Sequence, residues 1–154
     1  MTVEVRRAAA ADLDTLVAFN VAMAKESEDL GLDPATLRLG IEAVLNDPSR
    51  GLYFVAETGG QVAGTLMITY EWSDWRNGRF WWIQSVFVVM QHRRQGIYRA
   101  LHQHVRTLAS NDPSSCGIRL YVERENTGAQ QTYHAMGMGE THYRLFEEEW
   151  VCGT

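Results

Sequence analysis

The sequence is poor in cysteine, proline and lysine. Its 154 residues include two cysteines, three prolines and a single lysine, Lys25. Cys116 and Cys152 are far apart and have no metal-ligand residues beside them, which argues against a disulfide framework and against a zinc site. With one lysine in the chain, Schiff-base chemistry or a lysine nucleophile is not expected.

Long apolar runs and an excess of basic residues are also missing. No window reaches the roughly 18 consecutive apolar residues of a membrane span, so we expect no membrane partner. Residues 1–7 carry charge with no apolar stretch behind them, which is atypical of a secretory signal and favours a cytoplasmic protein. Because 14 basic residues face 19 acidic ones, the net charge of −5 disfavours nucleic acid as the main partner.

Hydrophobic periodicity predicts a single domain, residues 1–154, with a mixed α/β fold. Apolar residues make up 45% of the chain and charged residues 21%, a balance typical of globular domains. The predicted order is β-α-α-β-β-β-α-β-α-β, a central mixed sheet flanked by helices. The ten elements are expected at residues 2–7, 12–24, 33–46, 52–57, 62–72, 80–89, 98–110, 118–122, 126–137 and 141–149.

Capping residues mark the starts of three of these helices. Asp12, Asp33 and Asn126 each precede a segment with helical spacing of apolar residues, and their side chains can accept from free amides of the first turn. Pro34 suits the first helical position after Asp33.

The three central strands have their own signals. Gly59-Gly60 predicts the turn of a hairpin, and Gly64 inside the return strand indicates a bulge or a close backbone approach. Residues 80–89, FWWIQSVFVV, form the most apolar segment of the chain and predict a central strand buried on both faces.

The stretch 86–101, VFVVMQHRRQGIYRAL, runs from a buried strand through a short basic turn into a helix. The first amides of a helix have no intrahelical partner and lie at the positive end of its dipole, so such a turn can bind phosphate. Gly96 lets the backbone approach a ligand, and Arg93, Arg94 and Arg99 supply positive charge. From these residues alone, a solvated surface turn is an equal alternative.

A second stretch, residues 121–138 (YVERENTGAQQTYHAMGM), contains a capped helix. By itself it is most simply an ordinary helix with Tyr133 on its buried face.

Together the two stretches resemble the signatures of the GCN5-related N-acetyltransferase (GNAT) family. The first resembles V-x-P-x-x-R-x-x-G-x-G/A, matching at Arg93 and Gly96. It departs at Met90, where proline is usual, and at Tyr98, where a small residue is usual and where bulk could crowd the phosphates or point away. The second resembles N-x-x-A-x-x-x-Y-x-x-x-G-[FM], with Asn126, Ala129, Tyr133, Gly137 and Met138 in register.

The resemblance implies transfer of an acetyl group from acetyl-CoA to a primary amine, directly in a ternary complex. It implies that Tyr133 protonates the leaving thiolate and that Asn126 supports the cofactor arm or the helix start. It further implies that backbone groups near Phe87 and Val88 hold the pantetheine arm. The residues implied in binding the pyrophosphate are Arg93, Arg94, Gln95, Gly96, Ile97 and Tyr98.

The general base is less defined. The strand and the preceding turn, YEWSDWRNG, also resemble the spermidine/spermine acetyltransferases, where a glutamate stands at the position of Gln84. Because an amide accepts no proton at neutral pH, we expect Gln84 to position a water, unless it only satisfies buried backbone groups. Other groups that could take the proton are Glu71, Asp74, Glu123 and His134.

The acceptor is open among polyamines, other small amines, amino acids, aminoglycosides and protein amines. Trp72, Trp75 and Glu71 could line its pocket and would favour a cation, although packing is an equal explanation for both tryptophans. No metal site is expected, since His102 and His104 do not share a helix face. A non-catalytic acyl-CoA-binding module and a different acyl donor are the rival hypotheses, and a homodimer is open because many relatives pair.

Overall fold

The computed structural model describes residues 2–152. Contacts divide the chain into two compact units, Met1–Tyr121 and Val122–Thr154. The strands of the first unit are β1 (Glu4–Arg7), β2 (Leu52–Thr58), β3 (Gln61–Ser73), β4 (Gly78–Val88) and β5 (Ser115–Arg119). Its helices are α1 (Leu13–Glu28), α2 (Pro34–Asn46) and α3 (Ile97–Asn111), with short 3₁₀ turns at Ala10–Asp12 and Met90–His92.

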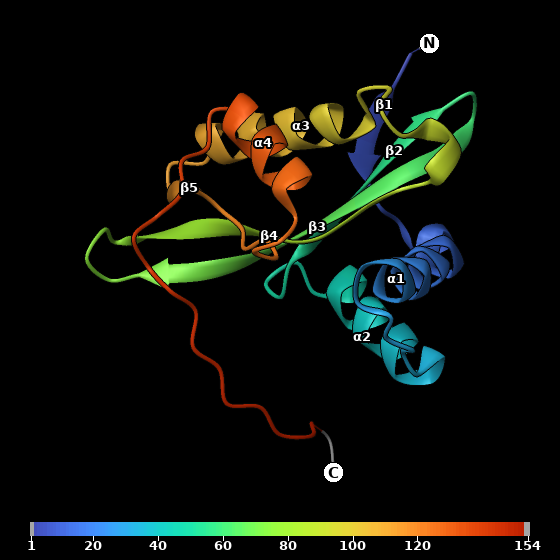
Figure 1. Ribbon diagram of the computed structural model, residues 1–154, viewed down its shortest axis with the longest axis horizontal. Helices are drawn as coiled ribbons and strands as arrows, with labels where there is room; N and C mark the ends of the chain where they lie inside the picture. The colour runs from blue at the N-terminus through green and yellow to red at the C-terminus, as the bar shows by residue number, and fades with distance from the viewer. Residues whose placement is uncertain (1, 153–154) are drawn as a thin grey trace. The chain divides into compact units, whose positions relative to one another are not determined.

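The strands form one mixed sheet in the order β1-β2-β3-β4-β5, as Figure 1 shows. Neighbours are antiparallel except β4 and β5, which are parallel because α3 connects them as a crossover. The mixed α/β class and the central sheet flanked by helices are therefore confirmed.

Helices cover both faces of this sheet. In Figure 1, α3 lies over one face, and α1 and α2 lie over the other. The burial pattern agrees, since the residues of α3 share one apolar cluster with the sheet and those of α1 and α2 share another. In the described part of the chain, no helix is long and apolar enough to cross a bilayer.

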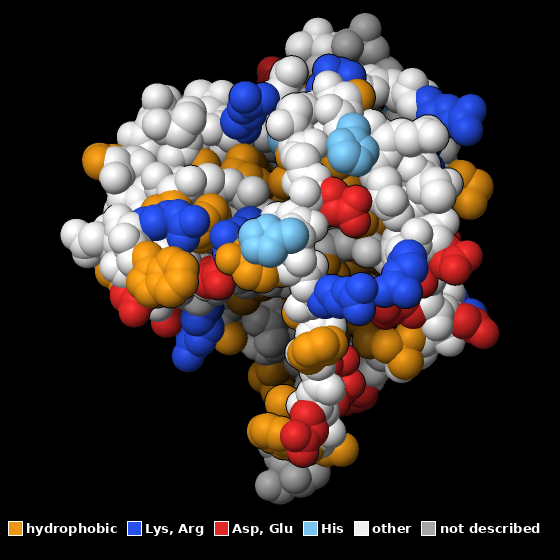
Figure 2. Space-filling view, turned by 60° about the vertical axis from the view of Figure 1, so that its left-hand side comes forward, with side chains coloured by type: hydrophobic (Ala, Val, Ile, Leu, Met, Phe, Trp, Pro, Cys, Tyr) orange, Lys and Arg blue, Asp and Glu red, His pale blue; other side chains and the backbone are white. Residues whose placement is uncertain are grey.

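Several basic side chains of the first unit pair with acidic neighbours. Figure 2 shows Lys and Arg side chains interspersed with Asp and Glu on the face it draws. The Arg6 guanidinium donates to both Asp12 (2.8 and 2.9 Å) and Glu57 (2.8 Å), and Arg38 donates to Asp14 at 2.6 Å. These pairs compensate the charges of the arginines that form them.

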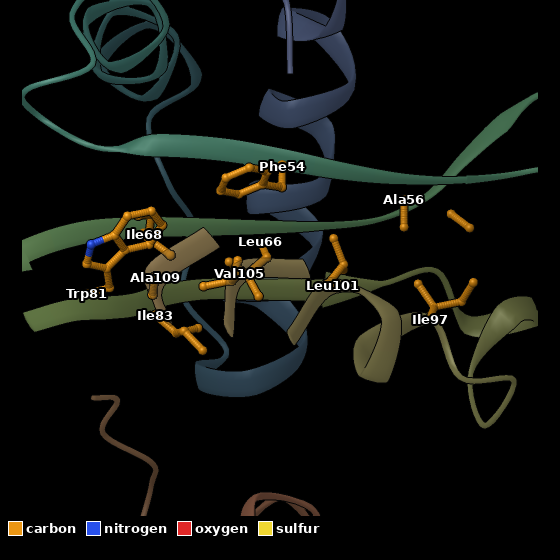
Figure 3. Close-up of a cluster of buried hydrophobic side chains, with 11 residues drawn as sticks. Phe54, Ala56, Leu66, Ile68, Trp81, Ile83, Ile97, Leu101, Val105 and Ala109 are labelled. Atoms are coloured by element: carbon orange, nitrogen blue, oxygen red, sulfur yellow. The ribbon is translucent and has the colours of Figure 1, made fainter. Parts of the chain in front are cut away.

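The larger core lies between α3 and the sheet (Figure 3). Phe54, Leu66 and Ile68 of the central strands are fully buried, and Leu101 and Val105 of α3 pack on them. The spacing of four between Leu101 and Val105 puts both on one helix face, which explains how a helix with a polar opposite side docks here.

Asp33 caps α2 as expected, with its carboxylate accepting from the Thr36 amide at 3.1 Å. Asp12 stands at the start of α1 but does not bond to the helix amides. Its carboxylate instead accepts from Arg6 and from the Ala9 amide at 2.7 Å, because a guanidinium is the stronger partner.

Two of the expected strands differ from the structure. β5 begins and ends earlier than the expected 118–122, at Ser115–Arg119. The expected strand at 141–149 is wrong, since the structure has no strand there. Its final residues, Glu147-Glu148-Glu149, are consecutive like charges of low strand propensity, and no strand pairs with them in residues 2–152.

Candidate functional site

The end of β4 leads into a tight basic turn that opens α3. After Val88, the 3₁₀ turn Met90–His92 reverses the chain, and Arg94 and Gly96 adopt left-handed φ angles of 61° and 83°. Gly96 is the N-cap of α3. The left-handed pair folds the backbone so that successive amides can point to one concave side, an arrangement that binds anions.

The amides of the first turn of α3 are available to a ligand. The first backbone bond of the helix joins the Ala100 amide to the Gly96 carbonyl at 3.0 Å. The N–H groups of Ile97 and Arg99 precede it and have no carbonyl partner within the helix. They lie at the positive end of the helix dipole, where a phosphate is stabilised.

Two glycines shape this region in different ways. A Cβ at Gly96 would meet no atom within 4 Å, so the space beside the turn at this residue is open. A Cβ at Gly64 would lie 2.7 Å from Ile97 Cγ2 and 3.1 Å from the Phe87 carbonyl. The absence of a side chain at Gly64 therefore lets α3 sit directly on β3, and the register shift beside it adds a bulge.

Arg93 is bound within the protein. Its Nε donates to the Val88 carbonyl at 2.9 Å, and its two Nη atoms meet the two carboxylate oxygens of Glu26 at 2.5 and 2.8 Å. The guanidinium also lies 5.7 Å from the centre of the Phe87 ring. Pairing with Arg93 lowers the pKa of the Glu26 carboxyl. Arg94 and Arg99 make no ion pair with described residues.

Tyr98 stands inside α3 and is directed along the helix. Its hydroxyl lies 3.0 Å from Nδ1 of His102, one turn further on, and the two rings meet edge to face. The hydroxyl therefore points away from the helix N-terminus. Burial lowers the pKa of His102, which keeps its imidazole neutral.

The edge of β4 is open over its second half. Pairing with β5 ends at Trp82 and Arg119, and in residues 2–152 no strand pairs with this edge from Ile83 to Val88. This half is also less buried than the expected fully covered strand, with Ser85 to Val88 only half-buried. The sheet thus splits beside β4 and leaves a row of unpaired backbone groups.

Alternation identifies which backbone groups face the open edge. The Val89 amide donates to Ala63 of β3 at 2.9 Å. Successive residues of a strand direct their N–H and C=O groups to opposite edges, so Phe87 faces β3 while Val86 and Val88 face outward. The structure therefore points to Val86 and Val88, and not to the expected Phe87, as the residues whose backbone lies at the open edge.

Gln84 is the extra residue of a β-bulge. Ile68 pairs with Ile83 and Met67 pairs with Ser85, so Gln84 has no partner on β3. Its side chain is exposed, and its Nε2 donates to Thr69 Oγ1 at 2.8 Å. Because this bond holds the amide nitrogen, the side-chain oxygen of Gln84 is left as an acceptor.

A polar cluster surrounds the point where the sheet splits. Glu71 Oε1 accepts from Trp82 Nε1 and from Arg119 Nη1, both at 2.9 Å. These two bonds lower the pKa of the Glu71 carboxyl, first through Trp82 and then through Arg119. The Tyr121 ring lies 6.1 Å from that of Trp82. The charge that Glu71 was expected to offer a cationic acceptor is thus partly compensated by Arg119.

The two tryptophans expected at an acceptor pocket lie near the tip of the β3–β4 hairpin. Trp72 pairs with Arg79, and Trp75 belongs to the turn. Their exposed fractions are 63% and 90%, so neither is packed in a core. Ile68 of β3 is the partner of Ile83, next to the bulge, and Trp72 lies four residues further along β3. This spacing corresponds to about 13 Å along the strand.

In the second unit, Asn126 and Tyr133 belong to helix α4 (Thr127–Ala135). Asn126 is the N-cap, and its Oδ1 accepts from the Ala129 amide at 3.1 Å, which confirms the expected cap. Burial raises the pKa of the Tyr133 phenol, so the hydroxyl stays protonated. Gly137 ends the segment in a left-handed conformation, with φ 93°.

The first unit therefore brings together the residues of the basic turn and of the open edge of β4, including Gln84. It separates these from Trp72 and Trp75. The acidic run from Glu26 to Asp29 suggests a cationic acceptor in the sequence, but the pairing of Glu26 with Arg93 and the places of Val86 and Arg119 were missed. Glu26 and Arg119 join the site through contacts between elements far apart in the chain. Counting back along the strand from Val89, the alternation of backbone direction is the one signal that could have identified Val86.

Known proteins resemble this chain over nearly its full length. The model of the acetyltransferase (GNAT) family matches residues 18–138. The crystal structure of a possible acetyltransferase from Clostridium difficile 630 is 42% identical, with a TM-score of 0.91 over 98% of this chain and 99% of that one. No curated protein sequence matches the chain.

Two more distant structures share the fold. An aminoglycoside N-acetyltransferase in complex with CoA is 17% identical, with a TM-score of 0.79 over 97% of this chain and 96% of that one. An aminoglycoside acetyltransferase from an uncultured soil metagenomic sample, in complex with sisomicin, is 16% identical, with a TM-score of 0.77 over 97% of each chain.

Proposed function

This chain belongs to the acetyltransferase (GNAT) family, and on that premise we propose that it moves an acetyl group from acetyl-CoA to a primary amine. The two substrates meet in a ternary complex, and the amine attacks directly without a covalent enzyme intermediate. The observation that carries the proposal is the left-handed turn at Gly96, with the free amides of α3 on one side of it and the open edge of β4 leading up to it.

The basic turn and the open edge fit acetyl-CoA as a co-substrate. The amides of Gly96, Ile97 and Arg99 suit a pyrophosphate, since they lie at a helix N-terminus and no side chain fills the turn. Arg94 and Arg99 add the positive charge, because Arg93 is already paired with Glu26. Gln95 and Tyr98 contribute backbone groups to the same turn.

The open edge suits the amide-containing arm of the co-substrate. A row of unpaired N–H and C=O groups binds an extended chain that carries its own amides, in the manner of an added strand. Val86 offers both of its backbone groups, and Val88 offers its amide, because the Val88 carbonyl already accepts from Arg93. Acetyl-CoA supplies the acyl group in an activated thioester, and the outward Val88 amide can donate to the carbonyl oxygen as negative charge develops on it.

The proton transfers are assigned to two groups. Gln84 holds an ordered water with its free side-chain oxygen, and this water takes the proton from the amine and passes it to the bulk solvent. Tyr133 donates its proton to the departing sulfur, an assignment that rests on the family signature; burial raises the pKa of its phenol, so the proton is present to be donated. Glu71 is a weak candidate for the base, since its lowered pKa reduces its affinity for a proton.

The acceptor is proposed only as a primary amine. The distant relatives in complex with CoA and with sisomicin act on aminoglycosides, and they share the fold of this chain at 16–17% identity. Trp72, Trp75 and Glu71 remain candidate contacts for an acceptor that extends along the hairpin. A homodimer and a cytoplasmic location stay expectations.

A non-catalytic acyl-CoA-binding module is the alternative, and one observation favours it: the residue at the bulge is Gln84, a neutral amide, at the position that the resemblance gives to the general base. The two functions differ in turnover. The purified chain is incubated with acetyl-CoA and a panel of polyamines, amino acids, aminoglycosides and peptides, and the released thiol is measured. Turnover on any amine supports the transferase; saturable binding of acetyl-CoA with no thiol released over the panel favours the module.

A further inference from the structure

A cavity lies on the α3 face of the first unit, away from the basic turn. Its volume is about 720 Å³, within the range of small-molecule sites. Residues from β1, β2, the β3–β4 hairpin and the C-terminal end of α3 line it, among them Arg7, Tyr70, Arg79, Trp81 and His104. The basic turn lies at the opposite, N-terminal end of the same helix.

The wall of this cavity contains two buried donors that no described residue satisfies. Trp81 is 5% exposed, and its indole Nε1 has no partner in the described part of the chain. Figure 3 draws this nitrogen at the outer end of the core cluster, on the side away from Ile97. The Nε of Arg79 is likewise buried without a partner. Buried donors are nearly always paired, so two together indicate that a ligand completes them.

The charges of the cavity favour an anion. Arg7 makes no ion pair with a described residue, and Arg79 keeps its Nε free although its Nη2 lies 3.3 Å from Asp112. Asp112 is the single carboxylate of the lining. It is already committed, because Ser114 donates to it from both its amide (3.0 Å) and its hydroxyl (2.8 Å).

The remaining walls favour a flat apolar body. The Arg79 guanidinium lies 3.9 Å from the centre of the Tyr70 ring, and the Tyr70 and Trp81 rings meet edge to face at 5.7 Å. The rings of His104 and Phe54 are 5.3 Å apart on the neighbouring wall. These mutual contacts hold the rings in place and give the cavity an aromatic wall, against which a planar ring can pack while its charged group reaches Arg79.

We propose that this cavity is a second ligand site, which binds a small aromatic carboxylate. The carboxylate meets Arg79 and Arg7, the ring packs against Tyr70 and His104, and an oxygen of the ligand accepts from Trp81 Nε1. The site is independent of the transfer reaction, since none of its residues belongs to the basic turn or to the open edge of β4.

Calorimetric titration of 4-hydroxybenzoate into the full chain, without acetyl-CoA, tests the site. We expect saturable binding, at least about tenfold tighter than that of benzyl alcohol, which lacks the charge, or of acetate, which lacks the ring. Arg79→Gln should weaken binding about tenfold, and Trp81→Phe about threefold, since it removes the indole donor together with part of the buried ring. Arg76→Gln, an exposed arginine of the same hairpin outside the cavity, is the matched control.

Melting curves check the fold of each variant, and Arg7→Gln, an exposed position, replaces Arg79→Gln if the latter is unfolded. Its expected effect is a loss of about threefold in affinity. The proposal is overturned if 4-hydroxybenzoate shows no saturation up to about 10 mM, if benzyl alcohol binds as tightly, or if Arg76→Gln and Arg79→Gln weaken binding equally. None of these results depends on whether the chain transfers acetyl groups.

Discussion

Arg93 and Glu26 form a two-armed ion pair that joins the basic turn to α1 across 67 positions of sequence. The same guanidinium holds the Val88 carbonyl at the end of β4. Arg93 is therefore a positioning residue that fixes the turn, and the charge left for a phosphate comes from Arg94 and Arg99.

Glu26→Gln should tighten binding of acetyl-CoA by up to about fivefold, because it removes a negative charge next to the turn. The cost in stability should stay below about 1 kcal/mol, since both side chains are more than a third exposed. Calorimetric titration measures the affinity, and Glu28→Gln, an exposed carboxylate on the same helix, is the control. Weaker binding in Glu26→Gln alone would mean that the turn depends on this pair for its shape.

Three glycine-to-alanine variants should change stability in three different ways. Gly64→Ala should cost about 2–3 kcal/mol, because its Cβ would lie 2.7 Å from Ile97 Cγ2. Gly96→Ala should cost about 1–2 kcal/mol from its left-handed backbone, without a clash. Gly40→Ala, in open space within α2, should stabilise by about 1 kcal/mol.

Urea denaturation measures these three free energies of unfolding. A larger loss of unfolding free energy in Gly96→Ala than in Gly64→Ala would contradict the close packing of α3 on β3.

Tyr133→Phe should lower kcat by about 100-fold or more and leave the affinity for acetyl-CoA unchanged, as expected when a general acid is removed. Because burial raises the phenol pKa above its ordinary value near 10, activity that depends on this proton should persist into strongly alkaline solution. Tyr143→Phe, at an exposed position, is the matched control. Equal kcat in the wild type and in Tyr133→Phe would remove Tyr133 from the mechanism.

Gln84→Glu should raise kcat/KM at neutral pH, by about tenfold, by placing a carboxylate at the bulge. The Thr69 hydroxyl, 2.8 Å from the present amide, can donate to the new group. The pH profile of kcat/KM should gain an acid limb. Thr69→Val in the Gln84→Glu background tests the partner, since losing this donor should move the acid limb to higher pH. A Gln84→Glu enzyme slower than the wild type at every pH would show that the bulge does not face the amine.

Stability should fall as the pH drops below about 6.5, because His102 has a depressed pKa in the folded chain. Above that pH the imidazole is neutral in both states; below it the unfolded chain binds a proton that the folded chain resists. The loss continues until the pH passes the folded pKa. Thermal melts from pH 8 to pH 5 measure it, and His102→Gln should flatten this part of the curve while leaving the acid transition below pH 4 in place.

The sequence predicts most elements where local chemistry decides them. The Asp33 and Asn126 caps hold in the structure because each carboxylate or amide meets an amide three residues away. Asp12 fails as a cap because Arg6, from another element, offers a stronger donor. The segment 141–149 fails as a strand because β pairing depends on a neighbour that no local pattern specifies.

The site is harder to predict than the fold. Gly96 and the arginines are visible because they are contiguous in sequence, whereas the bulge at Gln84 is hidden in the uninterrupted apolar run of residues 80–89. The pairing of Arg93 with Glu26 and of Glu71 with Arg119 depends on how helices and strands pack. Glu26 compensates the charge of Arg93, which was expected to bind the cofactor. Arg119 likewise compensates the charge of Glu71, which was expected to attract the acceptor.

The most direct test of the account is a nitrogen–proton correlation spectrum of the labelled chain during titration with acetyl-CoA. The account predicts saturable shifts, at submillimolar acetyl-CoA, of the backbone amides of Gly96, Ile97 and Arg99 and of Val86 and Val88 at the open edge. Shifts that leave these five amides unchanged, or no shifts at all, would contradict it.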